Sequence, residues 1–288
     1  MCFYGGFGLA TRTTGSIITP TPITPSMNLN PLNTNYARRL VPIIAGLALI
    51  ALSSCVQTPP SPTHPERLFT EDFESGKLDQ AIWTENVTGN NSIEVQSEKV
   101  AHGKYALRVR CPVPSNKTWA FILRQPLPEA LRQHYFGRVY MYITPAPPAR
   151  HTIFIMGGTP GFPNNKFEEV ATANGRWQLT YVDLRPNGDK EDYHSGGNPP
   201  LNRWFCLEWE FNDHPNHAKI WVDGQLVYET DFTVKARNAM SDLVGGFTDV
   251  AFGFRLWGAA PQAFDIYYDD IALDTQRIGQ LPDPIKNP

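Results

Sequence analysis

The segment VAFGFRLW, residues 250–257, carries two side chains that are unusual for a solvated strand face. Its apolar residues alternate, which predicts a strand with one face in the core. The opposite face presents small residues at 251 and 253, then Arg255 and Trp257. A guanidinium can donate two parallel hydrogen bonds to a carboxylate, and an indole offers a flat apolar surface. The structural alternative is a surface ion pair for Arg255 and a core-edge position for Trp257.

Paired acidic residues elsewhere suggest acid–base chemistry. Glu208 and Glu210 fall on one face of the segment FCLEWEFN, residues 205–212, and glycoside hydrolysis uses two carboxylates. A solvated face of charge is the stronger interpretation, because this hairpin is typical of a rear sheet. The following NDHPNHAK holds His214 and His217, but no third metal ligand has a fixed spacing to them. We interpret it as a hairpin turn.

The elements that would position these residues are strands of a single domain, residues 67–277. Short β-branched or aromatic segments recur there, separated by Gly, Pro, Asn and Asp. We predict strands within residues 92–98, 105–111, 120–126, 137–144, 151–157, 177–184, 205–212, 217–224, 250–257 and 265–273. Only residues 128–135 (PEALRQHY) are typical of a helix. The pattern favours an all-β fold, a two-sheet antiparallel jelly-roll sandwich.

The charge balance argues against one class of partner. The chain has 25 basic and 28 acidic residues, a formal charge of −3. Proteins that bind nucleic acid normally present a basic surface, and no basic run compensates here. We therefore expect no nucleic-acid partner. We also expect a monomer.

The pattern of the N-terminal region predicts an export signal. Residues 36–55 (YARRLVPIIAGLALIALSSC) contain two arginines, a thirteen-residue apolar run and small residues before Cys55. This pattern is typical of a signal peptide, and the run is too short to span a membrane. The ending LSSC resembles the bacterial lipobox, which implies cleavage before Cys55 and lipidation of its thiol. The alternative is an ordinary secretory signal with an incidental cysteine.

The lipobox interpretation divides the rest of the chain. Residues 1–54 would be an upstream extension, with Met27 as the true start, plus the signal peptide. Residues 55–66 would be the lipidated cysteine and an extended Pro-rich tether, and residues 278–288 a C-terminal tail. The lipid would be the only membrane attachment. We therefore expect the protein outside the cytoplasm, in the bacterial cell envelope at the outer membrane or cell surface.

Two further cysteines follow the predicted cleavage site, Cys111 and Cys206. Disulfides persist in exported proteins, so we expect this pair to be bridged or adjacent. Two buried free thiols are nearly as plausible an arrangement. We do not expect a catalytic thiol.

The order of several short motifs resembles that of the cellulose-induced-protein family. The domain begins LFTEDFESGKLDQAIW and ends FDIYYDDIAL, with HGKYALRV, RVYMYI, EWEF, IWVDG and GFTDVAFGFRLWG between them. The resemblance covers nearly all of residues 68–275. Members of this family are secreted concanavalin A-like jelly rolls related in fold to glucuronan and alginate lyases. The resemblance therefore implies a fold of the concanavalin A-like lectin or glucanase type and a polysaccharide partner.

The resemblance also implies a structural calcium ion where the two ends of the domain meet. Asp72 from the first strand and Asp269 or Asp270 from the last would bind it, with carbonyl oxygens near His102 and Lys104. A hard cation prefers several oxygen ligands, and clustered carboxylates otherwise repel each other. The alternative is that Asp72 and its neighbours only cap a turn.

In such jelly rolls one concave sheet accepts a glycan, which gives Arg255 and Trp257 a role. Trp257 would stack on a sugar ring, Arg255 would bind hydroxyls or a uronate carboxylate, and Ala251 and Gly253 would leave room for the chain. The strand residue Arg124 matches an arginine of alginate-lyase-like folds. The competing interpretations are a non-catalytic carbohydrate-binding lipoprotein that uses the same face, and a structural envelope protein.

The reaction that the resemblance favours is β-elimination of a uronate-containing polysaccharide. It needs a group that neutralises the C5 carboxylate, a base for the C5 proton and an acid for the leaving oxygen. Arg124 or Arg255 would neutralise the carboxylate, and His151, which opens the segment HTIFIMG, would be the base. A purely structural His151 is the alternative. Tyr140 is our first candidate for the acid, and the other tyrosines that could act or bind substrate are Tyr142, Tyr181 and Tyr267.

Overall fold

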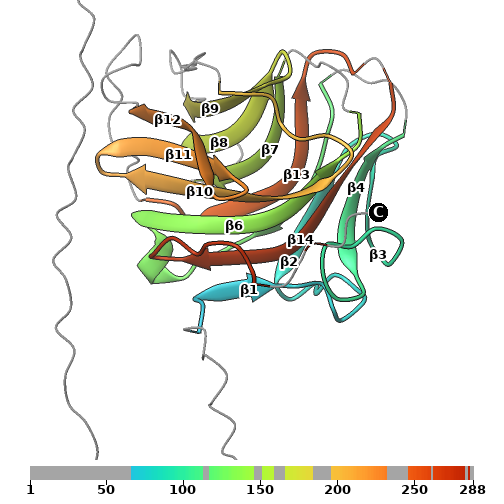
Figure 1. The fold of residues 1–288 in the computed structure, drawn as a ribbon, viewed down its shortest axis with the longest axis horizontal. Helices are drawn as coiled ribbons and strands as arrows, with labels where there is room; N and C mark the ends of the chain where they lie inside the picture. The colour runs from blue at the N-terminus through green and yellow to red at the C-terminus, as the bar shows by residue number, and fades with distance from the viewer. Residues whose placement is uncertain are drawn as a thin grey trace, which may run out of the picture. The chain divides into compact units, whose positions relative to one another are not determined.

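The chain forms the two-sheet antiparallel sandwich that its sequence predicts (Figure 1). The computed structural model describes residues 66–112, 117–145, 151–158, 166–183, 196–231, 246–260, 262–282 and 285. These residues belong to one compact unit, Pro60–Pro288. The predicted lipidation site, Cys55, lies outside the described residues.

Two sheets make up the sandwich, and all their strand pairs are antiparallel. Sheet A has the order β12 (Gln225–Asp231), β11 (Asn216–Val222), β10 (Trp204–Asp213), β6 (His134–Ile143), β14 (Phe264–Asp274), β4 (Ala106–Cys111) and β3 (Ser92–Gln96), and β1 (Phe69–Glu71) pairs with β14. Sheet B has the order β2 (Trp83–Val87), β5 (Trp119–Arg124), β13 (Asp249–Trp257), β7 (His151–Gly158), β8 (Lys166–Ala173) and β9 (Arg176–Asp183).

The core lies between the two sheets and follows the alternation of the strands. The inward residues of β13 are fully or almost fully buried in it: Val250, Phe252, Phe254 and Leu256. The ring of Phe252 reaches sheet A, where its centroid lies 5.8 Å from that of Trp209 and 6.3 Å from that of Tyr268. The predicted core face of residues 250–257 is thus confirmed. Its opposite face is the outer face of sheet B.

Three local predictions meet different outcomes. The helix expected over residues 128–135 is only a 3-10 turn, η1 (Glu129–Leu131), because His134 already begins β6 and pairs with β10. An isolated helix this short is marginal, so sheet pairing prevails. Four strands lie outside the ten ranges predicted from the sequence: β1, β2, β8 and β12. The hairpin turn expected in NDHPNHAK is confirmed, since β10 and β11 pair on either side of it, with Asp213 opposite Asn216.

The expected disulfide is not formed. Cys111 and Cys206 are both buried, and they are not bridged to each other. Cys111 belongs to the main core, whereas Cys206 lies in a separate cluster on the outer face of sheet A, and β14 and β6 separate their strands. Three strand spacings of about 4.8 Å far exceed the Cα separation that a disulfide spans. The alternative of two buried thiols is correct, and burial raises the pKa of Cys206 to about 12.

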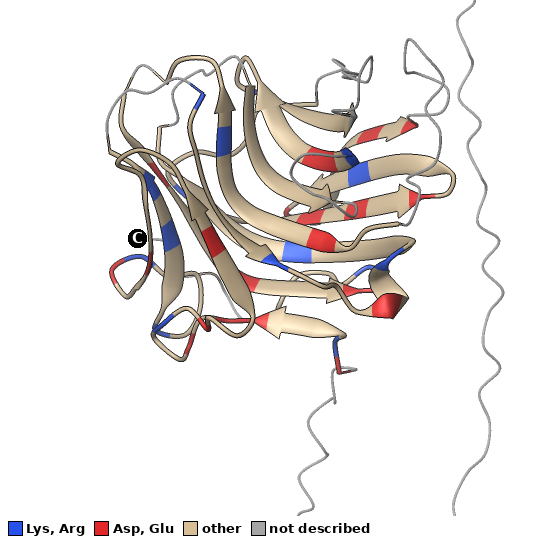
Figure 2. Cartoon of the chain, turned by 180° about the vertical axis from the view of Figure 1, so that it is seen from behind, with Lys and Arg blue, Asp and Glu red and all other residues tan. Residues whose placement is uncertain are grey.

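The two ends of the domain meet on the last strand. β1 pairs with the end of β14, and the Arg67 guanidinium forms an ion pair with Asp274 at 2.9 Å. Beyond β14 the chain crosses sheet A, where Leu281 donates its backbone N–H to the Tyr140 hydroxyl. Positive and negative positions are interspersed on the described strands (Figure 2). Within the described part of the chain, no helix is long and apolar enough to cross a membrane.

Candidate functional site

Arg255 and Trp257 lie on the outer face of sheet B. The Arg255 guanidinium carbon is 4.6 Å from the Trp257 ring centroid and 5.9 Å from those of Trp119 and Phe167. Such contacts are attractive because the face of an aromatic ring is electronegative. Trp257 remains 38% exposed, whereas Arg255 is half-buried. The guanidinium is therefore held in place beside an accessible indole.

His151 is the neighbour of Trp257 on the adjacent strand. The two residues are directly opposite each other in the β13–β7 register. His151 is only 7% exposed. Burial, followed by the charge of Arg255, lowers the pKa of His151 to about 4. Its imidazole is therefore neutral near pH 7 and has one nitrogen able to accept a proton.

A carboxylate that the sequence reading missed completes this group. Glu169 in β8 is fully buried, and its Oε2 atom lies 3.6 Å from His151 Nε2. It shares the outer face of sheet B with Phe167 and Ala171, which pack in the same cluster. We call His151, Glu169, Arg255 and Trp257 the His151 cluster. The sequence signal for Glu169 is the acidic pair inside KFEEVATA, which becomes visible once that segment is recognised as a strand.

The small residues at 251 and 253 have a reason other than space for a ligand. Ala251 is fully buried among apolar side chains of the outer face. Gly253 has a φ of 149°, and a Cβ there would lie 2.2 Å from the carbonyl oxygen of Ala120. The glycine is required by the close approach of the β5 backbone. The expectation that these positions make room for a glycan chain is therefore replaced by a packing explanation.

Arg124 and the four candidate tyrosines do not join the His151 cluster. Arg124 points toward the core side, with its guanidinium carbon 4.4 Å from the Phe69 ring centroid. Tyr181 in β9 is buried in the main core between the sheets. The other three tyrosines are on the outer face of sheet A, in a cluster with Trp204: Tyr140, Tyr142 and Tyr267. The structure thus brings His151 together with Arg255 and not with Arg124 or Tyr140.

The aromatic cluster on sheet A is covered by other parts of the chain. Leu281 and Ile285 from the C-terminal segment pack against it. The Lys99 ammonium lies 4.0 Å from the Tyr142 ring centroid. Burial raises the pKa of the Tyr140 phenol well above its ordinary value, so this hydroxyl holds its proton. These tyrosines have structural contacts that account for their positions.

Glu208 and Glu210 lie on the outer face of sheet A, as expected of a rear-sheet hairpin, but they are buried rather than solvated. Arg277 pairs with Glu208 at 2.8 Å. Glu210 Oε1 meets Nε2 of His134 at 2.8 Å and Nε2 of His217 at 3.3 Å. Burial opposes ionisation of Glu210, but the bonds from His217 and His134 outweigh it and lower its pKa to about 2. Glu208 and Glu210 are therefore paired with different basic side chains and do not act together.

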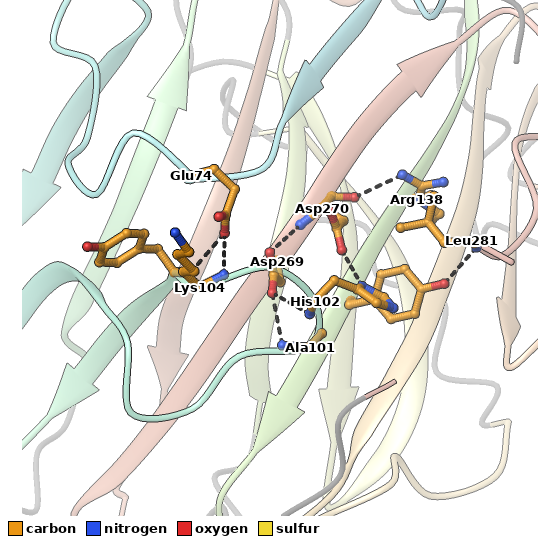
Figure 3. A network of polar contacts seen from close by, with 10 residues as sticks. Glu74, Ala101, His102, Lys104, Arg138, Asp269, Asp270 and Leu281 are labelled. Carbon is orange, nitrogen blue, oxygen red and sulfur yellow. Dashed lines mark hydrogen bonds and ion pairs between the residues drawn. The ribbon is translucent and has the colours of Figure 1, made fainter. Parts of the chain in front are cut away.

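Asp269 and Asp270, two of the three carboxylates predicted to bind calcium, lie beside the loop that precedes β4 (Figure 3). Asp269 accepts backbone N–H bonds from Ala101, His102 and Asp270 at 2.9, 3.2 and 2.9 Å. Asp270 Oδ2 lies 2.5 Å from His102 Nδ1. Burial and the neighbouring Asp270 raise the pKa of Asp269 to about 8. The hydrogen bonds that Asp269 accepts therefore fix the backbone of this loop against β14.

A calcium ion would find a smaller set of ligands than the sequence suggests. Burial raises the pKa of Asp270, and Asp72 adds to that rise, so these two carboxyl groups lie close to each other. Asp72 also accepts the backbone N–H of Glu74 at 3.0 Å, as a turn-capping residue does. Among the described residues, no group of three or more His, Cys, Asp or Glu side chains is arranged as a metal site. Calcium therefore stays a prediction that rests on Asp72, Asp270 and nearby carbonyl oxygens.

Comparison with known proteins gives likeness at the level of fold. No protein-family model and no curated protein sequence matches the chain. The structure is similar to that of the cellulose induced protein Cip1, with a TM-score of 0.58 and 17% identity over 74% of this chain and 100% of that one. It is also similar to an endo-β-1,4-glucuronan lyase from the fungus Trichoderma reesei, with a TM-score of 0.50 and 15% identity over 73% of this chain and 96% of that one. The concanavalin A-like jelly roll that the sequence predicts is confirmed.

Proposed function

We propose that the protein acts on a uronate-containing polysaccharide by β-elimination at the outer face of sheet B. The observation that carries this proposal is the neutral, buried His151 beside Arg255 and the accessible Trp257. A base, a cation and an aromatic surface then share one face. The likeness in fold to a glucuronan lyase supports the choice of reaction.

The reaction can be written with these residues alone. Arg255 would pair with the carboxylate of the uronate, and Trp257 would contact the sugar ring. His151 removes the C5 proton, the electron pair forms a C4–C5 double bond, and the bond from C4 to its glycosidic oxygen breaks. The imidazolium then gives the same proton to the leaving oxygen. One residue can serve as base and acid when both atoms lie on the same side of the ring.

Substrate binding would strengthen the base. In the free protein, the charge of Arg255 is one cause of the lowered pKa of His151. A uronate carboxylate paired with Arg255 would cancel part of that charge. The pKa of His151 would therefore rise toward its ordinary value when substrate is bound, which favours proton abstraction.

A second candidate function is carbohydrate binding without catalysis at the same face. It is favoured by one observation: the four candidate tyrosines, which could supply an acid, lie in the core or on sheet A. Binding needs only Arg255 and Trp257. The two functions differ in one measurable property, the release of an unsaturated product.

The test is incubation of the purified protein with a panel of polyuronates while the absorbance of the unsaturated product is followed. His151→Ala should abolish the reaction and Arg255→Ala should reduce it at least tenfold. His134→Ala is the matched control, since this strand histidine also pairs with a glutamate but lies on sheet A. Retention on a polyuronate gel without product would support the binding function. Neither product nor retention would refute both.

We further propose that lipidated Cys55 anchors the domain in the cell envelope through the tether of residues 55–66. The sequence LSSC after the apolar run supports this. Cys55→Ser should leave the N-terminus uncleaved by the lipoprotein pathway and should move the mature protein out of the lipid-labelled fraction. Lipid labelling of the Cys55→Ser protein at the level of the unchanged chain would contradict the anchor.

A further inference from the structure

The carboxylate of Glu169 faces the buried nitrogen of His151. The two atoms concerned, Oε2 and Nε2, are 3.6 Å apart, and the side chains are 0% and 8% exposed. His151 Nε2 is itself a fully buried atom. The small exposed part of the side chain therefore belongs to atoms other than Nε2.

We propose that Glu169 is a positioning residue that keeps the proton of neutral His151 on Nε2, so that Nδ1 is the nitrogen that accepts a proton. A neutral imidazole has one N–H donor and one acceptor nitrogen, and an ionised carboxylate only accepts. At 3.6 Å the contact is longer than an ordinary hydrogen bond, but an ionised Glu169 still favours Nε2–H, because a bare nitrogen there would face another acceptor. The role in catalysis rests on the proposed function, whereas the position of the proton does not.

A cation from a neighbouring strand lies near Glu169. Arg255 from β13 and Glu169 from β8 influence each other, because the charge of Glu169 opposes the fall in the pKa of Arg255 that burial causes. A cation nearby favours the charged form of a carboxyl group. Among the described residues of the neighbouring strands, Arg255 and Glu169 are the charged groups that face His151.

The same carboxylate would assist the reaction after the proton has moved. When His151 takes a proton on Nδ1, the imidazolium carries a positive charge next to Glu169. An opposite charge at this distance stabilises that ion, and the stabilisation is large where water is excluded. Glu169 should therefore raise the rate of the step without touching the substrate.

Local backbone geometry makes the contact possible. His151 is opposite Ala173 in the β7–β8 register, and Ala171 lies between Ala173 and Glu169 on the same face. Both residues have only a methyl group, so no larger side chain separates the imidazole from the carboxylate.

The test is nitrogen NMR of the His151 imidazole in the full-length protein. The unchanged chain should show a single neutral form at pH 7, with Nε2 protonated and Nδ1 bare. The His151 titration midpoint should fall by about one pH unit or more in Glu169→Gln, because an opposite charge is lost. Glu168→Gln is the matched control: it is the adjacent buried glutamate in β8, which belongs to the inner face and not to the His151 cluster.

Two outcomes would overturn the proposal. One is a His151 with its proton on Nδ1, which would mean that Glu169 is the donor. The other is a Glu169→Gln midpoint equal to that of the unchanged chain and of Glu168→Gln. If a polyuronate is cleaved, Glu169→Gln should lower kcat at least tenfold with KM changed less than twofold. If none is cleaved, the proposed reaction fails while the NMR result still decides the role of Glu169.

Discussion

The phenol of Tyr268 in sheet A donates a hydrogen bond to the carbonyl oxygen of Gly253 in sheet B at 2.5 Å. A second contact runs from the same hydroxyl to the carbonyl oxygen of Phe154 at 3.2 Å. Both carbonyls lie where the register of sheet B shifts, between Phe252 and Arg255 and between Ile153 and Ile155. One side chain thus ties two irregular strands beneath the His151 cluster.

Removing this hydroxyl should weaken the fold and loosen the cluster. We expect Tyr268→Phe to lower the free energy of unfolding by about 1–3 kcal/mol, because two buried carbonyls lose a donor. Urea unfolding measures the change. Tyr135→Phe is the control, since the Tyr135 hydroxyl is buried and, among the described residues, its neighbour Trp209 makes no hydrogen bond of ordinary geometry with it. That variant should be nearly neutral, and equal losses in both variants would argue against the role of the Tyr268 bond.

The two faces of β13 should respond differently to truncation. Phe254 is fully buried, so Phe254→Ala should cost about 3–5 kcal/mol through lost burial and a cavity. Trp257 is 38% exposed. Trp257→Ala should cost no more than about 1 kcal/mol, the range of an exposed cation–π contact, and should lose retention in a polysaccharide affinity gel. A Trp257→Ala variant as unstable as Phe254→Ala would refute the binding role of this face.

The contact between Glu210 and His217 should make the free energy of unfolding depend on pH. The folded-state pKa of Glu210, about 2, is below its ordinary 4.5, so its contribution is present above about pH 4.5 and is lost as the pH falls toward 2. The bond to Glu210 raises the pKa of His217 above 6.5, and that contribution is lost as the pH rises through the folded value. Stability from this pair is therefore greatest between about pH 4.5 and 6.5.

Substitution of Glu210 tests whether stability from this pair is greatest in that pH range. Glu210→Gln should cost about 1.5–3 kcal/mol at pH 5.5, the range for hydrogen bonds to a charged group, and less at pH 3 or pH 9. Unfolding by urea at the three pH values gives the differences. Glu98→Gln removes a mostly exposed carboxylate and should have little effect. A loss for Glu210→Gln that is the same at every pH would show that its charge is not responsible.

Calcium, if it binds at Asp72 and Asp270, should raise the melting temperature. A metal that binds only the folded chain stabilises it by about 2.7 kcal/mol at one hundred times its dissociation constant. Chelator should remove this gain, and Asp270→Ala should make the melting temperature insensitive to chelator. Asp265→Ala, on the same strand, should keep the sensitivity. Identical melting curves of the unchanged chain with calcium and with chelator would contradict the site.

The alternation of apolar and other residues along β13 correctly predicted which side chains face the core and which face outward. Because successive side chains of a strand point to opposite faces, Phe254 and Arg255 could be assigned to core and surface from the sequence alone. Alternation does not reveal which sheet a strand joins. Tyr140 and His151 therefore seemed able to meet, although β6 and β7 belong to different sheets and both residues point outward on opposite sides of the sandwich.

Glu169 could not be found by the same means. The segment KFEEVATA has two glutamates and two alanines, which are poorly represented in strands. It is nevertheless a strand because β7 and β9 pair with it on both sides. Tertiary pairing outweighs local preference there, and the residue that we place behind His151 depends on that pairing.

The first strand of the domain lies beside the last, with Phe69 opposite Leu273. A domain whose first and last strands are neighbours can be inserted into a surface loop of another protein without distorting either structure. The same adjacency would allow the old ends to be joined and new ones opened elsewhere, as in circular permutation. The pairing of β1 with β14 therefore makes this jelly roll suited to insertion and to circular permutation.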